Sequence, residues 1–562
     1  MKFQLCAKKH WQIMTLVLLA VLFLIVYSWL YYGPVPKFTS PDETANYYFI
    51  THFANNSSLE VPVSTDSDIG KLITPRSMIV RDGYLVPGSF LGMILIYGLV
   101  AKIIGIKLIL FATPLLSVVA VIFFYFLMKK IFSKFIAFIS SLLLFVLPPF
   151  WYYSSRGMFH NIIFVDFLII ALYFLVCALT AQSHNKQWAM VSLAGLFIGL
   201  ALITRTSEIL WVGLVIVVIA VFSDKKIFIL QWLTFTIIVM ALFVPIIMLN
   251  HQLYGSFFTF AYSPSTISEG PVIGPAAAAT NTTLFLKIRQ LIIPFGIDIP
   301  RAADMAGNYL VKLLPWFSIG FICMLAWLVR KLVMRILVKY QFINAQSNGP
   351  FTRAQVLYAW FFVVVTLWLV LYYGAYTFHE YIDKSRIILG SSYLRYWLPI
   401  YVFSLPLIVL ALENLGQLFT RKHWRVLITL GYITLFTLFS VASTLQDPLQ
   451  GLHQLKKNIR NEQLIAETVF QETHVQSIII SGFADKVFFP ERRVVVSLPS
   501  TPGNMSSAAH QLLDISDVFL YYNPLDSQTA SMMEILSKQG FRFEKISTFS
   551  DDGTALYRVW ST

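Results

Sequence analysis

Residues 38–50 read Phe-Thr-Ser-Pro-Asp-Glu-Thr-Ala-Asn-Tyr-Tyr-Phe-Ile and follow the first long apolar segment of the chain. Asp42 and Glu43 in this stretch are adjacent carboxylates, which cannot lie in hydrocarbon and must face water or a polar cleft at the membrane surface. Ser40 and Pro41 predict that a helix starts here, because proline suits the first helical turn and acidic side chains are favoured near a helix N-terminus. Such a pair can serve as a base, as metal ligands or as proton carriers.

The composition indicates a membrane protein with many spans. Of the 562 residues, 57% are hydrophobic and only 12% are charged, which is too little charge for the surface of a soluble protein of this length. The net charge of +14 comes from short basic clusters between apolar segments, a pattern typical of cytoplasmic loops at an anionic membrane face. We therefore expect no binding to nucleic acid. Cys6, Cys177 and Cys323 provide neither a disulfide framework nor a cysteine metal site.

Apolar segments of about membrane-spanning length recur along the first four fifths of the chain. They cover residues 11–31, 88–106, 107–128, 134–152, 160–181, 189–205, 207–222, 228–249, 309–329, 355–376, 396–413 and 424–443. The first ends in aromatic residues rather than at a small-residue cleavage site, so we interpret it as a retained anchor. The second contains four glycines and Lys102, and we predict that it is re-entrant or surface-lying. Eleven spans then remain of the twelve segments.

The basic clusters predict on which side each loop lies. They are Lys8/Lys9, Lys129/Lys130/Lys134, Lys225/Lys226, Arg330/Lys331/Arg335/Lys339 and Arg421/Lys422/Arg425. If all of them are cytoplasmic, the long loops 32–87, 250–308 and 377–395 lie outside, and so does the tail 446–562. A twelve-span arrangement would place the tail in the cytoplasm. Within the tail, residues 477–480, 493–497 and 518–521 are predicted strands and residues 528–538 a predicted helix, which indicates a small α/β domain.

The first span, a short link and Pro-Asp-Glu before Tyr-Tyr-Phe resemble the first outer loop of the GT-C-type membrane glycosyltransferases. This superfamily includes the protein O-mannosyltransferases and the lipid A aminoarabinose transferases. Four further segments are similar to family segments, namely Leu127 to Phe135, Gly199 to Arg205, Asn250 to Gly255 and Tyr393 to Pro399. The resemblance covers roughly residues 10–445, and the order and spacing of the segments carry it.

The resemblance implies an α-helical polytopic GT-C-like module over residues 1–445. The strand pattern and the basic clusters add the expectation of an extracytoplasmic α/β domain over 446–562. The resemblance further implies an inverting, multi-pass enzyme of the plasma membrane with its active site outside. Such an enzyme transfers a sugar from a polyprenyl-phosphate donor to a hydroxyl of a glycan, lipid or protein acceptor. Asp42 matches the family's catalytic base, because an attacking hydroxyl needs a carboxylate to take its proton, and Glu43 would assist. No cofactor is expected. Ser155 to Asn161 lacks the acid that many relatives carry in the second loop, which weakens a divalent-metal site.

The leaving polyprenyl phosphate needs cationic groups to stabilise its developing charge. Arg395, beside Tyr396 at the outer end of a span, is the first candidate for binding it, with an interfacial anchor as an equal alternative. Arg156 and His160 are further candidates, and they would share one helix face if residues 152–161 were helical. Arg81 is a weaker one, because it replaces a lysine that relatives often place just before the proline that follows the first loop.

The other polar residues can be explained by structural roles alone. Arg205 and Glu208 are predicted to form an ion pair that closes a short turn, with phosphate contact as the second reading. Asp166 lies in a span, so it is either functional or satisfied by a local hydrogen bond. The charged third loop is interpreted as solvated rather than acceptor-binding; its residues are His379, Glu380, Asp383, Lys384 and Arg386.

Three alternatives to this transferase stay open. The first is a transporter or flippase of lipid-linked sugars, although no internal repeat is evident and the polar candidates gather at one face. An oligosaccharyltransferase is the second, although the tail contains no Trp-Trp-Asp sequence. A non-catalytic GT-C relative is the third. The sequence identifies neither the sugar nor the acceptor.

Overall fold

The computed structural model describes residues 2–31, 37–63, 67–222, 227–257, 295–339, 352–376, 378, 387–416, 422–497, 510–524, 526–549 and 553–561. The chain divides into two units, each assembled from three separate stretches. The helical unit comprises Met1–Leu30, Phe111–Leu242 and Ala279–Gln454. The mixed unit comprises Tyr31–Leu110, Phe243–Ala278 and Leu455–Thr562. The mixed unit contains Asp42, Glu43 and Arg81, and the helical unit contains Arg156, His160, Arg395 and Tyr396.

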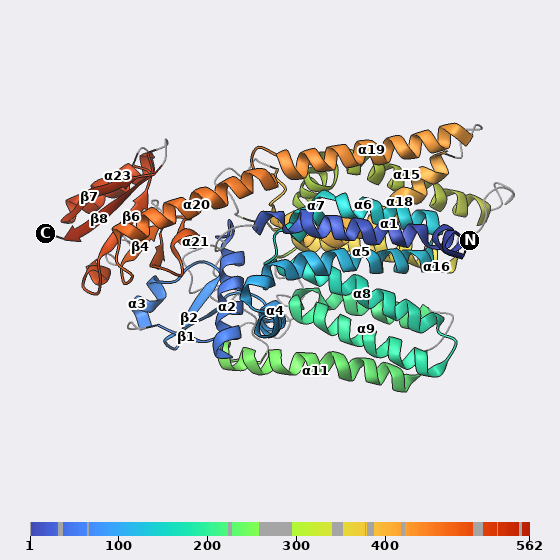
Figure 1. The fold of residues 1–562 in the computed structure, drawn as a ribbon, viewed down its shortest axis with the longest axis horizontal. Coiled ribbons are helices and arrows are strands. Elements are labelled where there is room, and N and C mark those ends of the chain that lie inside the picture. Colours follow the sequence, from blue (N-terminus) through green and yellow to red (C-terminus); the bar gives the residue numbers. More distant parts are fainter. Residues whose placement is uncertain are drawn as a thin grey trace. The chain divides into compact units, whose positions relative to one another are not determined.

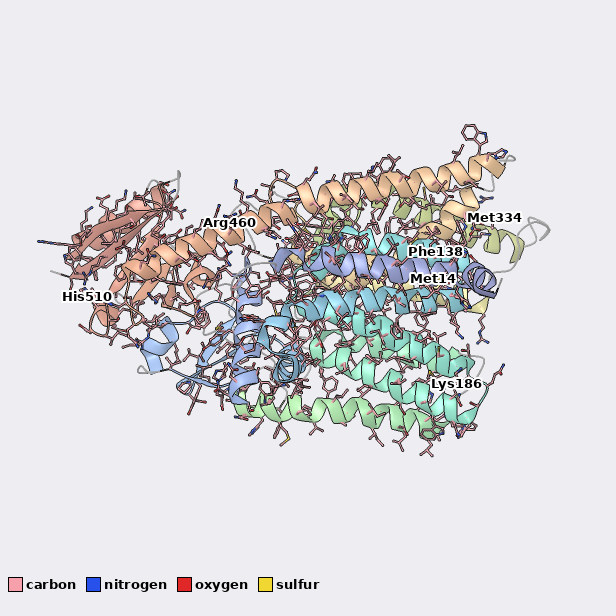
Figure 2. All side chains as sticks on the ribbon, viewed as in Figure 1. Met14, Phe138, Lys186, Met334, Arg460 and His510 are labelled. Atoms are coloured by element: carbon pink, nitrogen blue, oxygen red, sulfur yellow. The ribbon has the colours of Figure 1, made fainter. Side chains whose placement is uncertain are left out.

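Apolar helices, most of them long, build the helical unit, and a few short helices connect them (Figure 1). They are α1 (Lys2–Ser28), α5 (Ala112–Ile131), α6 (Lys134–Val146), α7 (Pro148–Ser155), α8 (His160–Thr180), α9 (His184–Thr204), α10 (Ile209–Phe222), α11 (Ile229–Tyr254, which continues into the mixed unit), α14 (Ile299–Ala306), α15 (Pro315–Lys339), α16 (Arg353–Gly374), α17 (Ser392–Tyr396), α18 (Leu398–Gly416) and α19 (Lys422–Gln446). The largest fully buried side chains of this unit include Trp397, Tyr152 and Tyr401, so its core is rich in aromatic residues. Figure 2 shows Met14 of α1 beside Phe138 of α6, where these two helices pack.

Each of the twelve predicted apolar segments contains helix in the structure. Within the described residues, nine helices are long and apolar enough to cross a membrane, and α6 with α7 makes a tenth if this pair, bent by 52°, is one span. The bend lies at Leu147, whose backbone is extended before two prolines. Two helices are shorter, Leu91–Ile104 and Thr206–Val221. The first of these has 14 residues, whereas a span needs about 20, in agreement with the prediction that segment 88–106 is not a full span.

One predicted boundary differs from the structure. The approximate apolar segment 309–329 starts within Gly307–Lys312, which forms a π-helical turn, and α15 begins only at Pro315. Proline favours the first turn of a helix because it has no backbone N–H to leave unbonded there. The predicted span is therefore divided at its N-terminal end.

The first loop and the tail together form most of the mixed unit. In the first loop, α2 (Pro41–Asn56) packs on α4 (Leu91–Ile104), and a small antiparallel sheet has the order β1-β3-β2. Its elements are β1 (Val61–Pro62), α3 (Ser67–Leu72), β2 (Met78–Arg81) and β3 (Tyr84–Pro87). The loop therefore has a sheet of its own, which the sequence analysis did not predict.

The tail is an α/β domain, as predicted. Its five-stranded sheet has the order β5-β4-β6-β8-β7, with β5, β4 and β6 parallel and β8 and β7 antiparallel. The elements are α20 (Leu452–Glu472), β4 (Ile478–Ser481), α21 (Asp485–Phe488), β5 (Arg493–Val496), β6 (Val518–Tyr522), α23 (Ser527–Lys538), β7 (Phe541–Thr548) and β8 (Ala555–Ser561). The three predicted strands and the predicted helix correspond to β4, β5, β6 and α23. The last two strands were missed, although alternating side chains in Phe-Arg-Phe-Glu at the start of β7 are a period-two signal.

Candidate active site

Asp42 and Glu43 lie in the first turn of α2, as predicted from the sequence. Ser40 precedes the helix with an extended backbone, and its carbonyl oxygen accepts a hydrogen bond from the backbone N–H of Thr44 at 3.2 Å. The helix start thus fixes the direction in which both carboxylates leave the backbone. Their negative charge also suits the partial positive charge of a helix N-terminus.

The two carboxylates have different surroundings. Glu43 is only 1% exposed, and its Oε1 accepts a hydrogen bond from the hydroxyl of Tyr31 at 3.1 Å. Asp42 is half-buried, and its Oδ1 accepts a hydrogen bond from the hydroxyl of Ser77 at 2.5 Å. An acceptor molecule can therefore approach Asp42 more readily than Glu43. Ser77, which the sequence analysis did not single out, orients the more accessible acid.

Arg81 lies at the far end of β2 from Ser77. Four residues of extended chain separate their Cα atoms by roughly 13 Å. The Arg81 side chain pairs with the exposed Asp82 at 3.3 Å and packs against Gly255 after α11. Gly255 has a φ of +74° and no Cβ that would collide with the guanidinium group. These contacts direct Arg81 toward α11, and its phosphate-binding role stays a prediction.

In the helical unit, the turn between α7 and α8 presents Arg156. Residues 152–161 do not form one helix, because α7 ends at Ser155 and α8 begins at His160. The argument that Arg156 and His160 share a helix face is therefore wrong, although both side chains are buried near this turn. The hydroxyl of Thr113 donates to the carbonyl oxygen of Gly157 at 2.6 Å and fixes the turn.

Arg156 and Arg395 contact the same aromatic ring. The guanidinium carbons of Arg156 and Arg395 lie 4.7 Å and 5.1 Å from the ring centre of Phe159. Arg395 also lies 5.2 Å from the ring of Tyr396 and donates to the hydroxyl of Ser392 at 2.8 Å. Two guanidinium groups at one ring repel each other, and an anion between or beside them would relieve that repulsion.

Arg205 extends this row to a third guanidinium group. Its carbon lies 4.9 Å from the ring of Tyr396, and that ring stacks on Tyr373 with ring centres 4.6 Å apart. Arg205 also forms a buried ion pair with Glu208 at 2.7 Å and donates to the Tyr373 hydroxyl. The predicted ion pair is thus confirmed. We call Arg156, Phe159, Arg395, Tyr396 and Arg205 the arginine–aromatic row. Neither Phe159 nor Tyr373 was predicted, because nothing in the sequence distinguishes them from core aromatics.

An apolar cavity of about 470 Å³ lies near Glu208, the ion-pair partner of Arg205 at one end of this row. Trp211 lines the cavity, and its indole N–H donates to the second carboxylate oxygen of Glu208 at 2.5 Å. Leucine, isoleucine, valine and phenylalanine side chains from α5, α8, α10, α16 and α18 form most of the wall. Lys130 and Arg353 lie at the opposite end of these helices. A long hydrocarbon chain is the chemistry that such a wall accepts.

The remaining candidates have structural explanations or lie outside the described residues. Buried Asp166 accepts a hydrogen bond from the hydroxyl of Ser117 at 2.7 Å, which supports the reading of a local partner. Among the side chains that the structure describes, no group of three or more His, Cys, Asp or Glu could hold a metal ion. The charged residues of the third loop, from 379 to 386, are outside the described residues.

Comparison with known proteins identifies the fold. Residues 91–249 match the family model described as dolichyl-phosphate-mannose-protein mannosyltransferase. ArnT from Cupriavidus metallidurans is similar in the apo state, with 11% identity and a TM-score of 0.52, and bound to undecaprenyl phosphate, with 12% and 0.53. The chain has the GT-C fold. Both GT-C comparisons with ArnT cover 98% of this chain and 98% of ArnT.

A second GT-C structure supports the same assignment. The archaeal oligosaccharyltransferase AglB from Archaeoglobus fulgidus, in complex with an inhibitory peptide and a dolichol-phosphate, is 13% identical with a TM-score of 0.53. The match covers 98% of this chain and 74% of AglB. A comparison with curated proteins gives no match. The predicted resemblance to the GT-C-type membrane glycosyltransferases is thus confirmed at the level of the fold.

Proposed function

We propose that this protein is a glycosyltransferase that moves a sugar from a polyprenyl-phosphate donor to an acceptor hydroxyl on the outer face of the cell membrane. The arginine–aromatic row is the observation that carries the proposal. It concentrates cationic groups at buried and half-buried positions, next to a cavity that suits a hydrocarbon chain. Phosphate joined to a long apolar chain is a ligand with both properties.

In this proposal, Arg395 and Arg156 bind the donor phosphate, with His160 and Tyr396 at its border. Guanidinium groups suit this task because their planar donors match phosphate oxygens and stay charged at every accessible pH. As the bond between the sugar and the phosphate breaks, negative charge grows on the leaving phosphate. The cations would then stabilise the transition state more than the bound donor, which is the condition for catalysis.

The apolar cavity would receive part of the polyprenyl chain. Its wall is almost entirely hydrocarbon, so the chain would exchange contacts with lipid tails for packing against similarly apolar side chains. The structural relatives support this kind of donor, because ArnT was determined with undecaprenyl phosphate and AglB with a dolichol-phosphate. The wall does not select a sugar, so the sugar and the acceptor must be recognised elsewhere.

Asp42 would be the general base and Glu43 its helper. A carboxylate that takes the proton of the attacking hydroxyl must reach it directly or through one water, and Asp42 is the more accessible of the two acids. Attack by the activated hydroxyl on the anomeric carbon, opposite the leaving phosphate, would invert the sugar. Buried Glu43 would act by holding the helix start and the local negative charge in place.

The proposal is tested by a transfer assay in membranes with a panel of polyprenyl-phosphate sugars. We expect transfer from at least one donor by the wild type, and a loss of at least 100-fold for Asp42→Asn, since a positioned base contributes about 10²–10⁴ in rate. Glu60→Gln, in the same loop, removes a carboxylate that contacts Gln252 and should keep full activity. An Asp42→Asn variant that is inserted, folded and fully active would refute the base. No transfer from any donor would favour a non-catalytic relative.

A further inference from the structure

Asp485 of the tail binds Arg76 of the first loop with an unusually complete set of hydrogen bonds. The Asp485 carboxylate accepts from the backbone N–H of Arg76 at 2.9 Å, from its Nε at 2.9 Å and from its Nη2 at 2.5 Å. The same Nη2 donates to the carbonyl oxygen of Phe483 at 2.8 Å, and the guanidinium group lies 4.9 Å from the Phe483 ring. Asp485 is 1% exposed. Arg76 is therefore fixed in both backbone and side chain.

The residue after Arg76 is Ser77, whose hydroxyl donates to Asp42. Ser77 has a φ of +62°, a conformation that residues other than glycine rarely adopt. Its carbonyl oxygen accepts from the backbone N–H of Gly88 at 3.0 Å, and a Cβ on Gly88 would lie 2.7 Å from the Ser77 backbone. Ser77 is thus held in an unfavourable backbone conformation by Arg76 on one side and Gly88 on the other. Such local strain persists only where the surroundings impose it.

The next residue of the tail holds the chain on the other side of Asp42. Lys486 donates to the carbonyl oxygen of Thr39 at 2.6 Å, just before the first residues of α2, and pairs with Glu462 of α20 at 3.2 Å. Lys37 adds an ion pair with Glu491 at 2.7 Å. Asp485 and Lys486 therefore bind the chain on both sides of Asp42, at Arg76 and at Thr39.

We propose that Asp485 is a positioning residue for the Asp42 base, acting through Arg76 and Ser77, so that the tail is a working part of the active site. The inference rests on the proposed function of Asp42. The alternative is that the tail only stabilises the first loop. Both explanations predict that Asp485→Asn lowers the activity, but they differ in the property of the protein that changes. Positioning alters the orientation and the protonation of Asp42, whereas stabilisation alters only the fraction of folded protein.

Other charged groups on the elements that meet at the start of α2 also influence the protonation of Asp42 in a pH experiment. They are Glu43 on the helix, Lys37 before it, Arg76 before β2, and Asp485 and Lys486 on α21. Ser77→Ala leaves all of these charges in place and removes one donor from Asp42. A carboxylate that loses a donor is protonated more easily. Because a base must be unprotonated to act, the acidic limb of the pH–rate profile should move to higher pH.

The experiment measures kcat and its pH profile for Ser77→Ala, Asp485→Asn and the double variant of the full chain in membranes. We expect each single variant to lower kcat about tenfold, with the donor KM nearly unchanged. Ser77→Ala should move the acidic limb upward by about one pH unit. Asp485→Asn should move it upward by less, because it also removes a negative charge that itself raises the pKa of Asp42. The double variant should be no worse than Ser77→Ala, because both changes act through the same hydroxyl. Asp517→Asn, which removes a half-exposed surface pair with Arg558, is the matched control. An unshifted profile, with activity falling only as the folded fraction falls, overturns the proposal.

A second readout does not need activity. Carbodiimide with an amine labels protonated carboxyl groups, and mass spectrometry gives the pH dependence of labelling at Asp42. In Ser77→Ala and Asp485→Asn, half-maximal labelling should occur at higher pH than in the wild type. If the wild type transfers no sugar but labelling shifts, the proposed function fails and the positioning role stands. If labelling of folded Asp485→Asn equals that of the wild type, the positioning role is refuted.

Discussion

At the scale of single residues, Arg395 is defined by the rings it contacts. Phe159 and Tyr396 hold its guanidinium group, and Ser392 accepts one of its N–H donors. Contacts with ring faces use the flat surface of the guanidinium group, whereas its hydrogen-bond donors lie in the plane. The rings can therefore fix the position of the charge, while N–H groups in the guanidinium plane donate to a phosphate oxygen.

Replacing Arg395 should affect the donor more than the acceptor. For Arg395→Ala we expect the donor KM to rise about tenfold or more, because one charge-assisted hydrogen-bond partner of the phosphate is lost, with a much smaller change in the acceptor KM. Arg395→Lys should recover only part of the loss, since an ammonium group lacks the planar fork. Initial rates with each substrate varied in turn give both constants.

The control for this prediction is Arg301→Ala. Arg301 is half-exposed and pairs with Asp298 at 3.6 Å, an interaction that contributes little at a surface. Its loss should leave both KM values unchanged. If Arg395→Ala weakens donor and acceptor equally, Arg395 serves the architecture of the site rather than the phosphate.

At the scale of elements, the turn before α17 depends on Gly390. A Cβ at this position would lie 1.8 Å from the side-chain oxygen of Gln450 and 3.0 Å from the hydroxyl of Tyr152. Tyr152 accepts a hydrogen bond from Arg156, and nearby Tyr153 donates to the carbonyl oxygen of Ser391 at 2.9 Å. The turn thus joins α7, which ends one residue before Arg156, to α17, which carries Arg395.

Gly390→Ala should lower both stability and donor binding. Overpacking a buried site costs about 1–3 kcal/mol, and the displaced Tyr152 would move Arg156 with it. Thermal unfolding in detergent and the donor KM measure the two effects. Gln450→Ala in the same chain should restore most of the loss by making room. Gly213→Ala, where a Cβ meets nothing within 4 Å, should be harmless, and equal damage from both alanines would contradict the steric argument.

The elements were more predictable from the sequence than the contacts of the site. Hydropathy, the Ser-Pro-Asp-Glu helix start and β-branched runs are local signals, and they gave the helices, α2 and three strands of the tail. The contact of Ser77 with Asp42, and the contacts of Phe159 with two arginines, depend on packing between segments distant in sequence. A serine in a loop and a phenylalanine in an apolar region carry no local mark of such roles. The break between Ser155 and His160 was missed for a related reason, because only the folded turn shows how Gly157 is held.

At the scale of the whole molecule, the mixed unit constrains the topology. The first loop and the tail are joined by ion pairs such as Lys37 with Glu491 and Arg76 with Asp485. Such pairs cannot form across a bilayer, so both segments lie on one side. The chain between them then crosses the membrane an even number of times, and α1 makes the total odd. Within the described residues, the nine candidate spans and the bent pair make ten, so an odd total needs one of the two shorter apolar helices, Leu91–Ile104 or Thr206–Val221, as an eleventh span.

Eleven spans with the basic clusters in the cytoplasm would place the tail outside. Figure 2 places Lys186 of α9 and Met334 of α15 at the same end of the helical unit as the N-terminus in Figure 1, as that arrangement requires. We predict that a tag after residue 562 is labelled by an impermeant reagent in intact cells, while a tag before residue 1 is labelled only after permeabilisation. Labelling of the C-terminal tag only after permeabilisation would contradict the eleven-span arrangement.

The link between the first loop and the tail also sets an order of events during synthesis. Lys37 and its partner Glu491 are 454 residues apart, so the loop is delivered to its side of the membrane long before the tail is made. Contacts this distant in sequence form late. The helix start that carries Asp42 consequently receives these contacts only after residues 485–491 have been made. If Asp42 is the base and Asp485 positions it, as we propose, a chain that is interrupted before the tail would be inserted in the membrane but would transfer no sugar.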